Sequence, residues 1–152
     1  MKELFQANIE EYFEEEELIN FVRVKKEYYR ERFQTIKETK NTISWNWAAF
    51  VFSGFWFLYR KMYLPGAFIL LADTLLTNFT HLRVSTWIIS ILCGLFANYQ
   101  YLDYCNTKLN KMDNLDIDKK EKRMSTQGGV SIVSVIVGLV LIYLVALLCA
   151  KF

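Results

Sequence analysis

The sequence predicts an all-α integral membrane protein, with three transmembrane helices, a re-entrant or interfacial aromatic helical hairpin, and a cytoplasmic amphipathic N-terminal helix. The first reason is composition: 53% of the 152 residues are hydrophobic and 16% are aromatic, which exceeds the usual content of soluble domains. The second is charge, because most charged residues lie within residues 1–40 and 108–123. The third is length: the uncharged runs 84–102 and 130–150 match the about 20 apolar residues that a membrane-crossing helix needs.

The composition also argues against several classes of function. The 18 Lys and Arg residues nearly balance 16 Asp and Glu residues, so no overall charge points to nucleic acid. The chain has one His and three Cys without metal-ligand spacing, so we expect no metal site. It contains neither a glycine-rich phosphate loop nor a catalytic-triad motif, so we expect no cofactor and no enzymatic activity.

Residues 1–42 form the predicted cytoplasmic segment. Residues 1–17 carry a net charge of −6 and fit either a short amphipathic helix or a solvated acidic tail. Residues 18–40 predict a single helix, because apolar residues recur on one face at i, i+4 and i+7 spacings. These residues are Leu18, Val22, Tyr29, Phe33 and Ile36.

Basic residues of this helix surround an aromatic stripe formed by Phe21, Tyr28, Tyr29 and Phe33. One interpretation is an interfacial helix that binds anionic lipid headgroups. The other is a solvated helix whose aromatic stripe packs on the rest of the domain. The candidate residues for lipid or partner binding are Arg23, Lys25, Lys26, Arg30 and Arg32.

The membrane domain, residues 43–152, begins with the run SWNWAAFVFSGFWFLYRKMY at residues 44–63. Ser44 is a candidate N-cap, and Pro65 fits the first turn of the following helix. Ser53 and Gly54 interrupt the run, which predicts two short helices over residues 44–52 and 55–63. Its aromatic and basic residues are candidates for the membrane interface: Trp45, Asn46, Trp47, Trp56, Tyr59, Arg60 and Lys61.

This run resembles the hallmark motif of a family of small bacterial membrane proteins of unknown function, S-W-N-W-A-A-F followed by F-W-x-L-Y-R-K-M-Y. Weaker resemblance extends over residues 21–33 and 94–99 and to the Gly128-Gly129 pair, so that it covers roughly residues 18–140. The sequence departs from the family at Ser53-Gly54, where Gly-Pro is usual, and a sharp bend is less strongly indicated there. The resemblance implies a location in the bacterial cytoplasmic membrane and assigns no activity.

The predicted spans are residues 64–80, 84–105 and 130–150, with a tight turn at residues 81–83 and a cytoplasmic loop over residues 106–129. Asp73 and Asn98 are the intramembrane polar candidates. A carboxylate at this depth usually faces a partner or a water-filled cavity, which suggests an ion pathway or a contact between subunits. The alternative is a packing role, in which Asp73 is neutral or bonds to Ser90 or Asn98 across the bundle.

Basic residues predict the topology, because Lys and Arg near spans favour the cytoplasm. If residues 44–63 re-enter, 16 basic residues share one side with the N-terminus and two lie on the other. If this segment crosses instead, the division is 10 to eight. We therefore predict that the N-terminus and residues 106–129 are cytoplasmic, and that His81 and Phe152 lie outside.

The leading functional hypothesis is a non-enzymatic membrane interaction or scaffold protein, whose basic helix contacts anionic lipid or a protein partner. Small residues at four-residue spacing, such as Ser90 and Gly94, fit packing within the bundle or a homo-oligomer. The alternative is a small transporter or channel component built around Asp73. A transporter predicts polar residues converging on a water-accessible cavity, whereas a scaffold predicts a dry bundle with an exposed amphipathic face.

Overall fold

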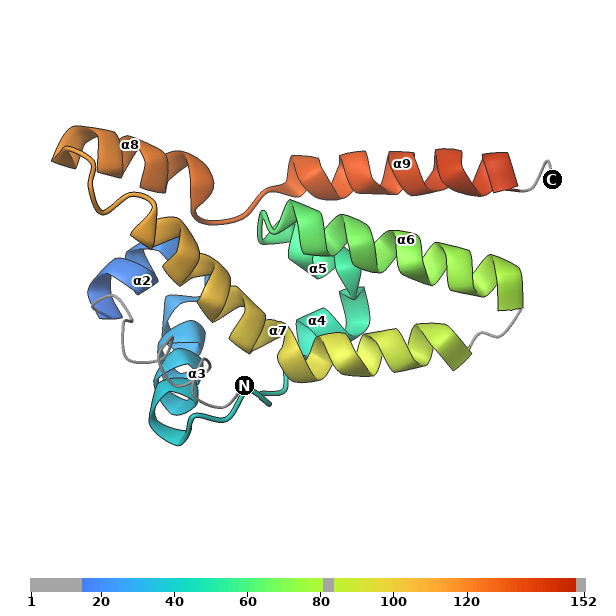
Figure 1. The fold of residues 1–152 in the computed structure, drawn as a ribbon, viewed down its shortest axis with the longest axis horizontal. Coiled ribbons are helices and arrows are strands. Elements are labelled where there is room, and N and C mark those ends of the chain that lie inside the picture. The colour runs from blue at the N-terminus through green and yellow to red at the C-terminus, as the bar shows by residue number, and fades with distance from the viewer. Residues whose placement is uncertain (1–14, 81–83, 150–152) are drawn as a thin grey trace. The chain divides into compact units, whose positions relative to one another are not determined.

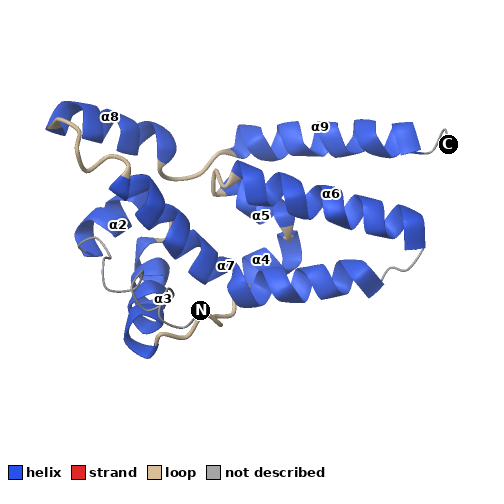
Figure 2. Ribbon diagram, in the orientation of Figure 1, coloured by secondary structure: helices blue, strands red, loops and turns tan. Residues whose placement is uncertain are grey.

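The computed structural model describes residues 15–80 and 84–149 (Figure 1). Every regular element in these ranges is an α-helix, as the predicted fold class requires (Figure 2). Residues 1–14, residues 81–83 with the predicted turn at His81, and residues 150–152 lie outside the described residues. The helices are α2 (Glu15–Val22), α3 (Lys26–Thr39), α4 (Trp47–Phe52), α5 (Gly54–Tyr59), α6 (Tyr63–Thr80), α7 (Val84–Asn110), α8 (Ile117–Gln127) and α9 (Ile132–Cys149).

The chain divides into two compact units. Met1–Ser44 and Asn98–Gly129 make up the first, which we call the charged unit because it holds all but five of the charged residues. Trp45–Ala97 and Val130–Phe152 make up the second, the apolar unit. Helix α7 contributes its N-terminal half to the apolar unit and its C-terminal half to the charged unit.

The core of the charged unit consists of large side chains from α2, α3 and α7. The five residues predicted to share one face of the N-terminal helix are all buried. Tyr29 and Phe33 pack on Tyr101 of α7, whose buried residues recur at three- and four-residue spacings, the pattern of a core-facing helix. Those residues of α7 are Asn98, Tyr101, Leu102, Cys105 and Leu109, each fully buried.

The predicted single helix over residues 18–40 is wrong, because the structure has two helices there. Arg23 and Lys25 adopt left-handed backbone conformations, with φ of 62° and 59°, which an uninterrupted helix excludes. The Phe21 carbonyl accepts a hydrogen bond from the Gly129 amide at 2.8 Å. The chain therefore turns sharply after α2, and residues 108 positions apart in the sequence hold this turn in place.

Residues 106–129, predicted as a loop, also contain regular structure. Helix α7 continues to Asn110, and α8 follows after a short turn. Lys120, Met124 and Gln127 are half-buried and recur at helical spacing, while most of the other α8 residues are exposed. The high polarity of this segment hides that weak periodicity, so the sequence alone predicts a loop there.

In the apolar unit, the predicted pair of short helices is present as α4 and α5. Ser53 separates them with φ of 44° and ψ of −127°, so the bend forms without the usual Gly-Pro. The predicted N-cap is wrong by two residues: the Asn46 side chain accepts from the Ala49 amide at 3.0 Å. Asn46 is favoured because its amide also donates to the Gly94 carbonyl at 2.7 Å, which fixes the start of α4 against α7.

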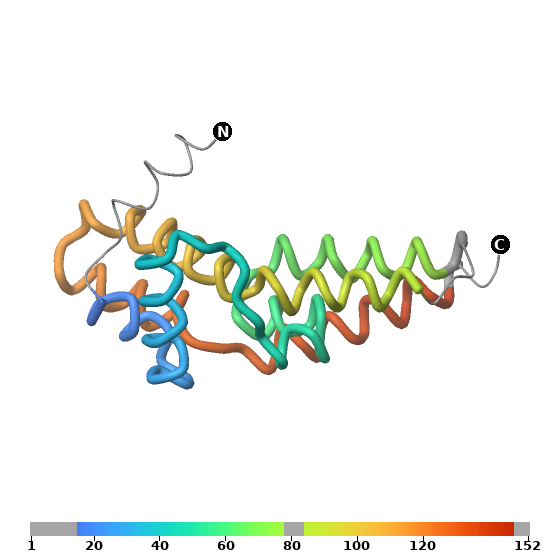
Figure 3. The backbone as a smooth tube through the Cα atoms, turned by 90° about the horizontal axis from the view of Figure 1, so that it is seen from below, coloured from blue at the N-terminus to red at the C-terminus, as the bar shows by residue number. Residues whose placement is uncertain are grey.

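Helices α5, α6 and α9 pack against one another (Figures 1 and 3). Gly54 and Gly66 lie at the contact between α5 and α6, where a Cβ atom on Gly54 would come within 2.9 Å of the Gly66 carbonyl oxygen. Helix α9 is tied to α5 by the Ser134 hydroxyl, which donates to the Leu58 carbonyl at 2.8 Å. Pro65 is the third residue of α6, in the predicted first turn.

The surface of the apolar unit is itself largely apolar. Leu64 is 84% exposed and Phe68 is 72% exposed on α6, and α9 exposes branched residues along most of its length. Taken singly, none of the described helices combines the length and the hydropathy expected of a membrane span. One pair, Ile117–Gln127 with Ile132–Leu147, reaches these criteria jointly across a 45° bend.

Candidate functional site

The motif of residues 44–63 builds an aromatic cluster on the apolar unit. The Trp45 ring covers Gly94, where an added Cβ would come within 3.2 Å of the indole. Trp47 and Phe50 pack on Trp45, each with ring centroids 5.2 Å away. Trp47 is 70% exposed and Trp87 of α7 is 64% exposed. The structure therefore gathers tryptophans from two segments on one exposed surface, of which sequence analysis identified only the first.

The second half of the motif is mostly interior. Trp56 is buried and meets Phe57 edge to face at 5.0 Å. The Arg60 residue is only 2% exposed, and its guanidinium lies 5.9 Å from the centre of the Tyr59 ring. Lys61 has φ of 62° and lies between α5 and α6. Trp56 and Arg60 thus pack inside the unit, whereas Trp47 remains at its surface.

A groove of about 460 Å³ lies between α5, α6 and α9. Leu58, Leu70, Val137 and Gly138 are among its lining residues, which are nearly all apolar. Its polar groups are the hydroxyls of Tyr63, Ser131 and Ser134. Asp73 does not line it. A groove of this character suits hydrocarbon rather than ions.

Asp73 has a hydrogen-bond partner other than those predicted. Its Oδ1 accepts from the Thr86 hydroxyl at 2.8 Å, so the contact joins α6 to the first turn of α7. Neither Ser90 nor Asn98 takes this role. The structure does not bring the two intramembrane polar candidates together: Asn98 belongs to the charged unit, where its Nδ2 donates to the Ser44 hydroxyl at 3.0 Å.

If Asp73 only packs, Asp73→Asn is expected to fold and accumulate normally, because the amide oxygen still accepts from Thr86. Thr86→Val removes the donor and is expected to lower stability by about 1 kcal/mol or less, as for other polar contacts between membrane helices. Denaturant unfolding of the two purified variants measures this. A folded Asp73→Asn variant that loses a measurable ion flux would instead favour the transporter hypothesis.

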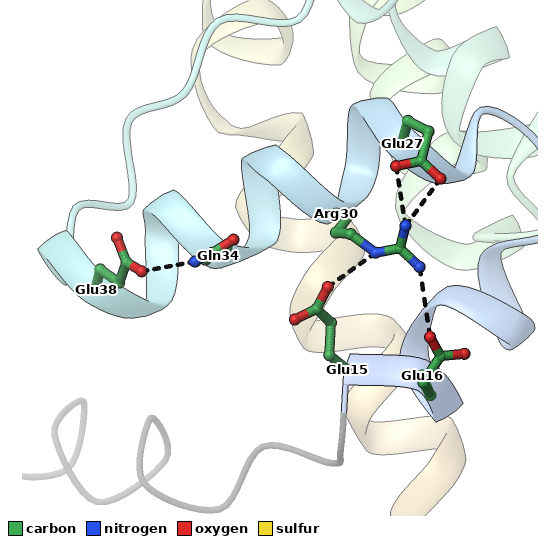
Figure 4. Close-up of polar contacts among 6 residues, drawn as sticks. All are labelled: Glu15, Glu16, Glu27, Arg30, Gln34 and Glu38. Carbon is green, nitrogen blue, oxygen red and sulfur yellow. Dashed lines mark hydrogen bonds and ion pairs between the residues drawn. The ribbon is translucent and has the colours of Figure 1, made fainter.

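The five basic candidates of the N-terminal segment do not form one open patch. Arg30 is surrounded by carboxylates: its Nε lies 2.8 Å from Glu15, its Nη2 3.6 Å from Glu16, and its Nη1 2.8 Å from Glu27 (Figure 4). The hydrogen bond to Glu27 is the main reason that the Arg30 pKa is raised. These three carboxylates offset the positive charge of Arg30, so its attraction for an anionic lipid headgroup is weak.

The other four basic residues lie in different surroundings. The Lys26 amine donates to the Asn20 side chain at 2.9 Å, and the Arg32 guanidinium lies 5.5 Å from the centre of the Tyr28 ring. Arg23 donates from Nη1 to the Ser125 carbonyl at 3.3 Å, beside the C-terminus of α8. Lys25 is exposed in the turn between α2 and α3. Because Tyr29 and Phe33 are buried, the structure favours the predicted alternative in which the stripe packs on the domain.

An ion pair joins α2 to α8 within the charged unit. Lys120 contacts Glu17, and its amine lies 3.6 Å from Asp113. The hydrogen bond to Glu17 raises the Lys120 pKa. Within the described ranges, no group of three or more His, Cys, Asp or Glu residues is placed to hold a metal ion. Cys93 and Cys105 are buried, and neither forms a disulfide with a described residue.

Comparison with known proteins identifies a family but no function. Neither the curated proteins nor the solved structures include a match to this chain. The bacterial membrane location that the sequence resemblance implies stays a prediction. Residues 10–105, which are more than half of the chain and include α2 to α6 and most of α7, match the family described as protein of unknown function (DUF2628). The chain therefore belongs to that family of unknown function.

Proposed function

We propose that the apolar unit lies in a lipid bilayer and that the protein acts there as a non-enzymatic scaffold, with the charged unit on the cytoplasmic side. The observation that carries this proposal is the contrast between the surfaces of the two units. The charged unit buries Phe21, Tyr29, Phe33 and Tyr101, whereas α4, α6, the first half of α7 and α9 expose aromatic side chains together with many branched residues. Such continuous apolar exposure marks a surface that another apolar phase covers.

Helix lengths fit this arrangement. Helices α6 and α9 each have 18 residues, which extend about 27 Å at 1.5 Å per residue, near the about 30 Å of a hydrocarbon core. Helix α7 contributes residues 84–97 to the apolar unit, and this uncharged stretch extends about 21 Å at 1.5 Å per residue. Helices α4 and α5 have six residues each and reach only about 9 Å, which suits a hairpin that enters and returns.

Contacts inside the charged unit support the re-entrant topology by parity. Glu17 and Phe21, which precede the membrane domain, contact Lys120 and Gly129, which follow α7. Both segments must then lie on the same side of the bilayer, so the chain between them crosses an even number of times. Crossings by α6 and α7 satisfy this requirement, whereas a third crossing at residues 44–63 would separate the contacting residues.

The charge distribution points to the cytoplasm for that shared side. The re-entrant arrangement places 16 basic residues there and two on the other side, a bias that the positive-inside rule favours strongly. The family resemblance implies the inner membrane of a bacterium. The apolar groove and the placement of Asp73 away from it favour a scaffold over a transporter.

Extraction and labelling test this proposal. The protein is expected to stay with membranes in alkaline carbonate and to leave them only in detergent. In a cysteine-free background, cysteines placed at Lys2 and at Lys119 are each expected to react with an impermeant thiol reagent only after the cytoplasmic side is opened. Release by carbonate contradicts the embedding, and labelling of the two positions from opposite sides contradicts the re-entrant topology.

A cysteine at Phe152 provides the matched control. Because α9 then crosses once after Gly129, this position is expected to label from outside in intact cells. Accessibility of Phe152 from the same side as Lys119 would contradict the crossing by α9.

A further inference from the structure

We propose that Arg23, Lys122 and Arg123 form a binding site for anionic lipid headgroups at the end of the charged unit from which α9 departs. This inference rests on the proposed function, because it places a bilayer next to that end of the chain. Of the five basic residues that the sequence predicts for lipid or partner binding, this site keeps only Arg23 and adds Lys122 and Arg123 of α8. The chemical class of the ligand is a phosphate-bearing lipid of net negative charge.

Among the described residues, charges on α8 are paired only in the first half of the helix. Lys119 lies 2.8 Å from Asp116, and Lys120 contacts Glu17, so the basic residues in the first half of the helix are matched by carboxylates. Lys122 and Arg123 are exposed, and neither makes an ion pair with a described residue. Asp118 and Glu121 are the acidic residues of α8, and both precede this pair.

Arg23 lies near the same end of α8. Its guanidinium donates to the Ser125 carbonyl at 3.3 Å, and its Cδ lies 3.0 Å from where a Cβ on Gly129 would be. Capping a helix C-terminus uses one of the five N–H donors of a guanidinium, which leaves donors for a phosphate oxygen. The turn between α2 and α3 thus adds an exposed arginine to a helix 102 residues further along the chain.

The chain beyond α8 carries no charge until its last residues. Glu121 is the last acidic residue, and after Arg123 no charged residue occurs until Lys151. Two glycines and two further residues connect α8 to α9, the helix proposed to enter the bilayer. Basic residues immediately before a membrane helix attract anionic headgroups, within a Debye length of about 8 Å at physiological salt.

By contrast, α3 is poorly suited to this role. Arg30 is held among three glutamates, and Tyr29 and Phe33, the aromatic residues of α3 that would have entered the lipid, are buried inside the charged unit. Lys26 and Arg32 are therefore a useful comparison, since their substitution removes the same amount of charge from a helix of the same unit. The two sites can be separated by one experiment.

The test uses the full chain reconstituted in phosphatidylcholine bilayers that contain spin-labelled phosphatidylglycerol or spin-labelled phosphatidylcholine. The measured quantity is the ratio of the two immobilised fractions. The wild type is expected to favour phosphatidylglycerol, and each lost charge is expected to lower the ratio about fivefold until no preference remains. Lys122→Gln/Arg123→Gln should therefore abolish the preference, Arg23→Gln should reduce it, and Lys26→Gln/Arg32→Gln should leave it unchanged.

Several outcomes would overturn the inference. A wild type without preference for phosphatidylglycerol contradicts it, as does a preference that survives Lys122→Gln/Arg123→Gln or disappears in Lys26→Gln/Arg32→Gln. Because Lys122 and Arg123 make no ion pair with a described residue, circular dichroism of their double variant should match the wild type. Incorporation into neutral bilayers without lipid preference refutes this site alone, whereas failure to incorporate refutes the proposed function as well.

Discussion

Tyr29→Ala is expected to lower the free energy of unfolding of the charged unit by about 3–5 kcal/mol, the range for removing a large aromatic from a packed core. Tyr29 is 2% exposed, and its ring lies 4.9 Å from Tyr28, 5.5 Å from Phe33 and 5.1 Å from Tyr101. The truncation would leave a cavity at the contact between α3 and α7. A loss of this size approaches the whole stability of a small domain.

Hydrogen exchange of the α3 amides in the detergent-solubilised protein measures the effect, with urea unfolding as a second readout. Tyr29→Phe is the matched control, because it keeps the ring and removes only the hydroxyl, and it is expected to lose about 1 kcal/mol. The two interpretations of the aromatic stripe differ here. A Tyr29→Ala variant of unchanged stability that binds anionic vesicles more weakly would restore the interfacial-lipid interpretation.

Periodicity in the sequence was enough to identify the buried face of the N-terminal segment, but not its course. Leu18, Val22 and Tyr29, which the apolar spacing predicts on one face, are all buried, because that spacing holds on each helix separately. The sequence has no glycine or proline at Arg23–Lys25 that would indicate a break between two helices. The break depends on the bond between Phe21 and Gly129, and such long-range contacts cannot be derived from local propensity.

The sequence also predicted only part of the candidate site. Residue types located the tryptophans and the Arg60-Lys61 pair after α5, but they did not reveal that Trp56 and Arg60 are buried while Trp87 joins the exposed aromatics. The five basic residues were grouped because they are close in sequence. The structure places them in different surroundings, because a glutamate of α2 pairs with Arg30 and a carbonyl of α8 accepts a hydrogen bond from Arg23.

The contact between α5 and α6 leads to the second large effect, for Gly54→Ala. A Cβ at this position would lie 2.5 Å from the Leu70 Cγ and 2.9 Å from the Gly66 carbonyl oxygen. Alanine would gain up to about 1 kcal/mol of helix propensity over glycine. Overpacking against a branch carbon and a backbone oxygen costs about 1–3 kcal/mol or more, because the oxygen is fixed by the helix and the Leu70 Cγ can move only by a change of χ1. The clash should therefore win, with a net loss of about 2 kcal/mol.

Gly138→Ala on α9 is the control that separates packing from propensity. Its Cβ would come within 2.4 Å of the Leu58 Cδ1, which is the end of a flexible side chain beside the apolar groove and can move aside. The propensity gain then remains, and stability should be unchanged or slightly higher. All four tryptophans belong to the apolar unit, so tryptophan emission during denaturant unfolding follows this unit in both variants. Equal stability of Gly54→Ala and the wild type would mean that α5 and α6 do not approach as closely as these glycines allow.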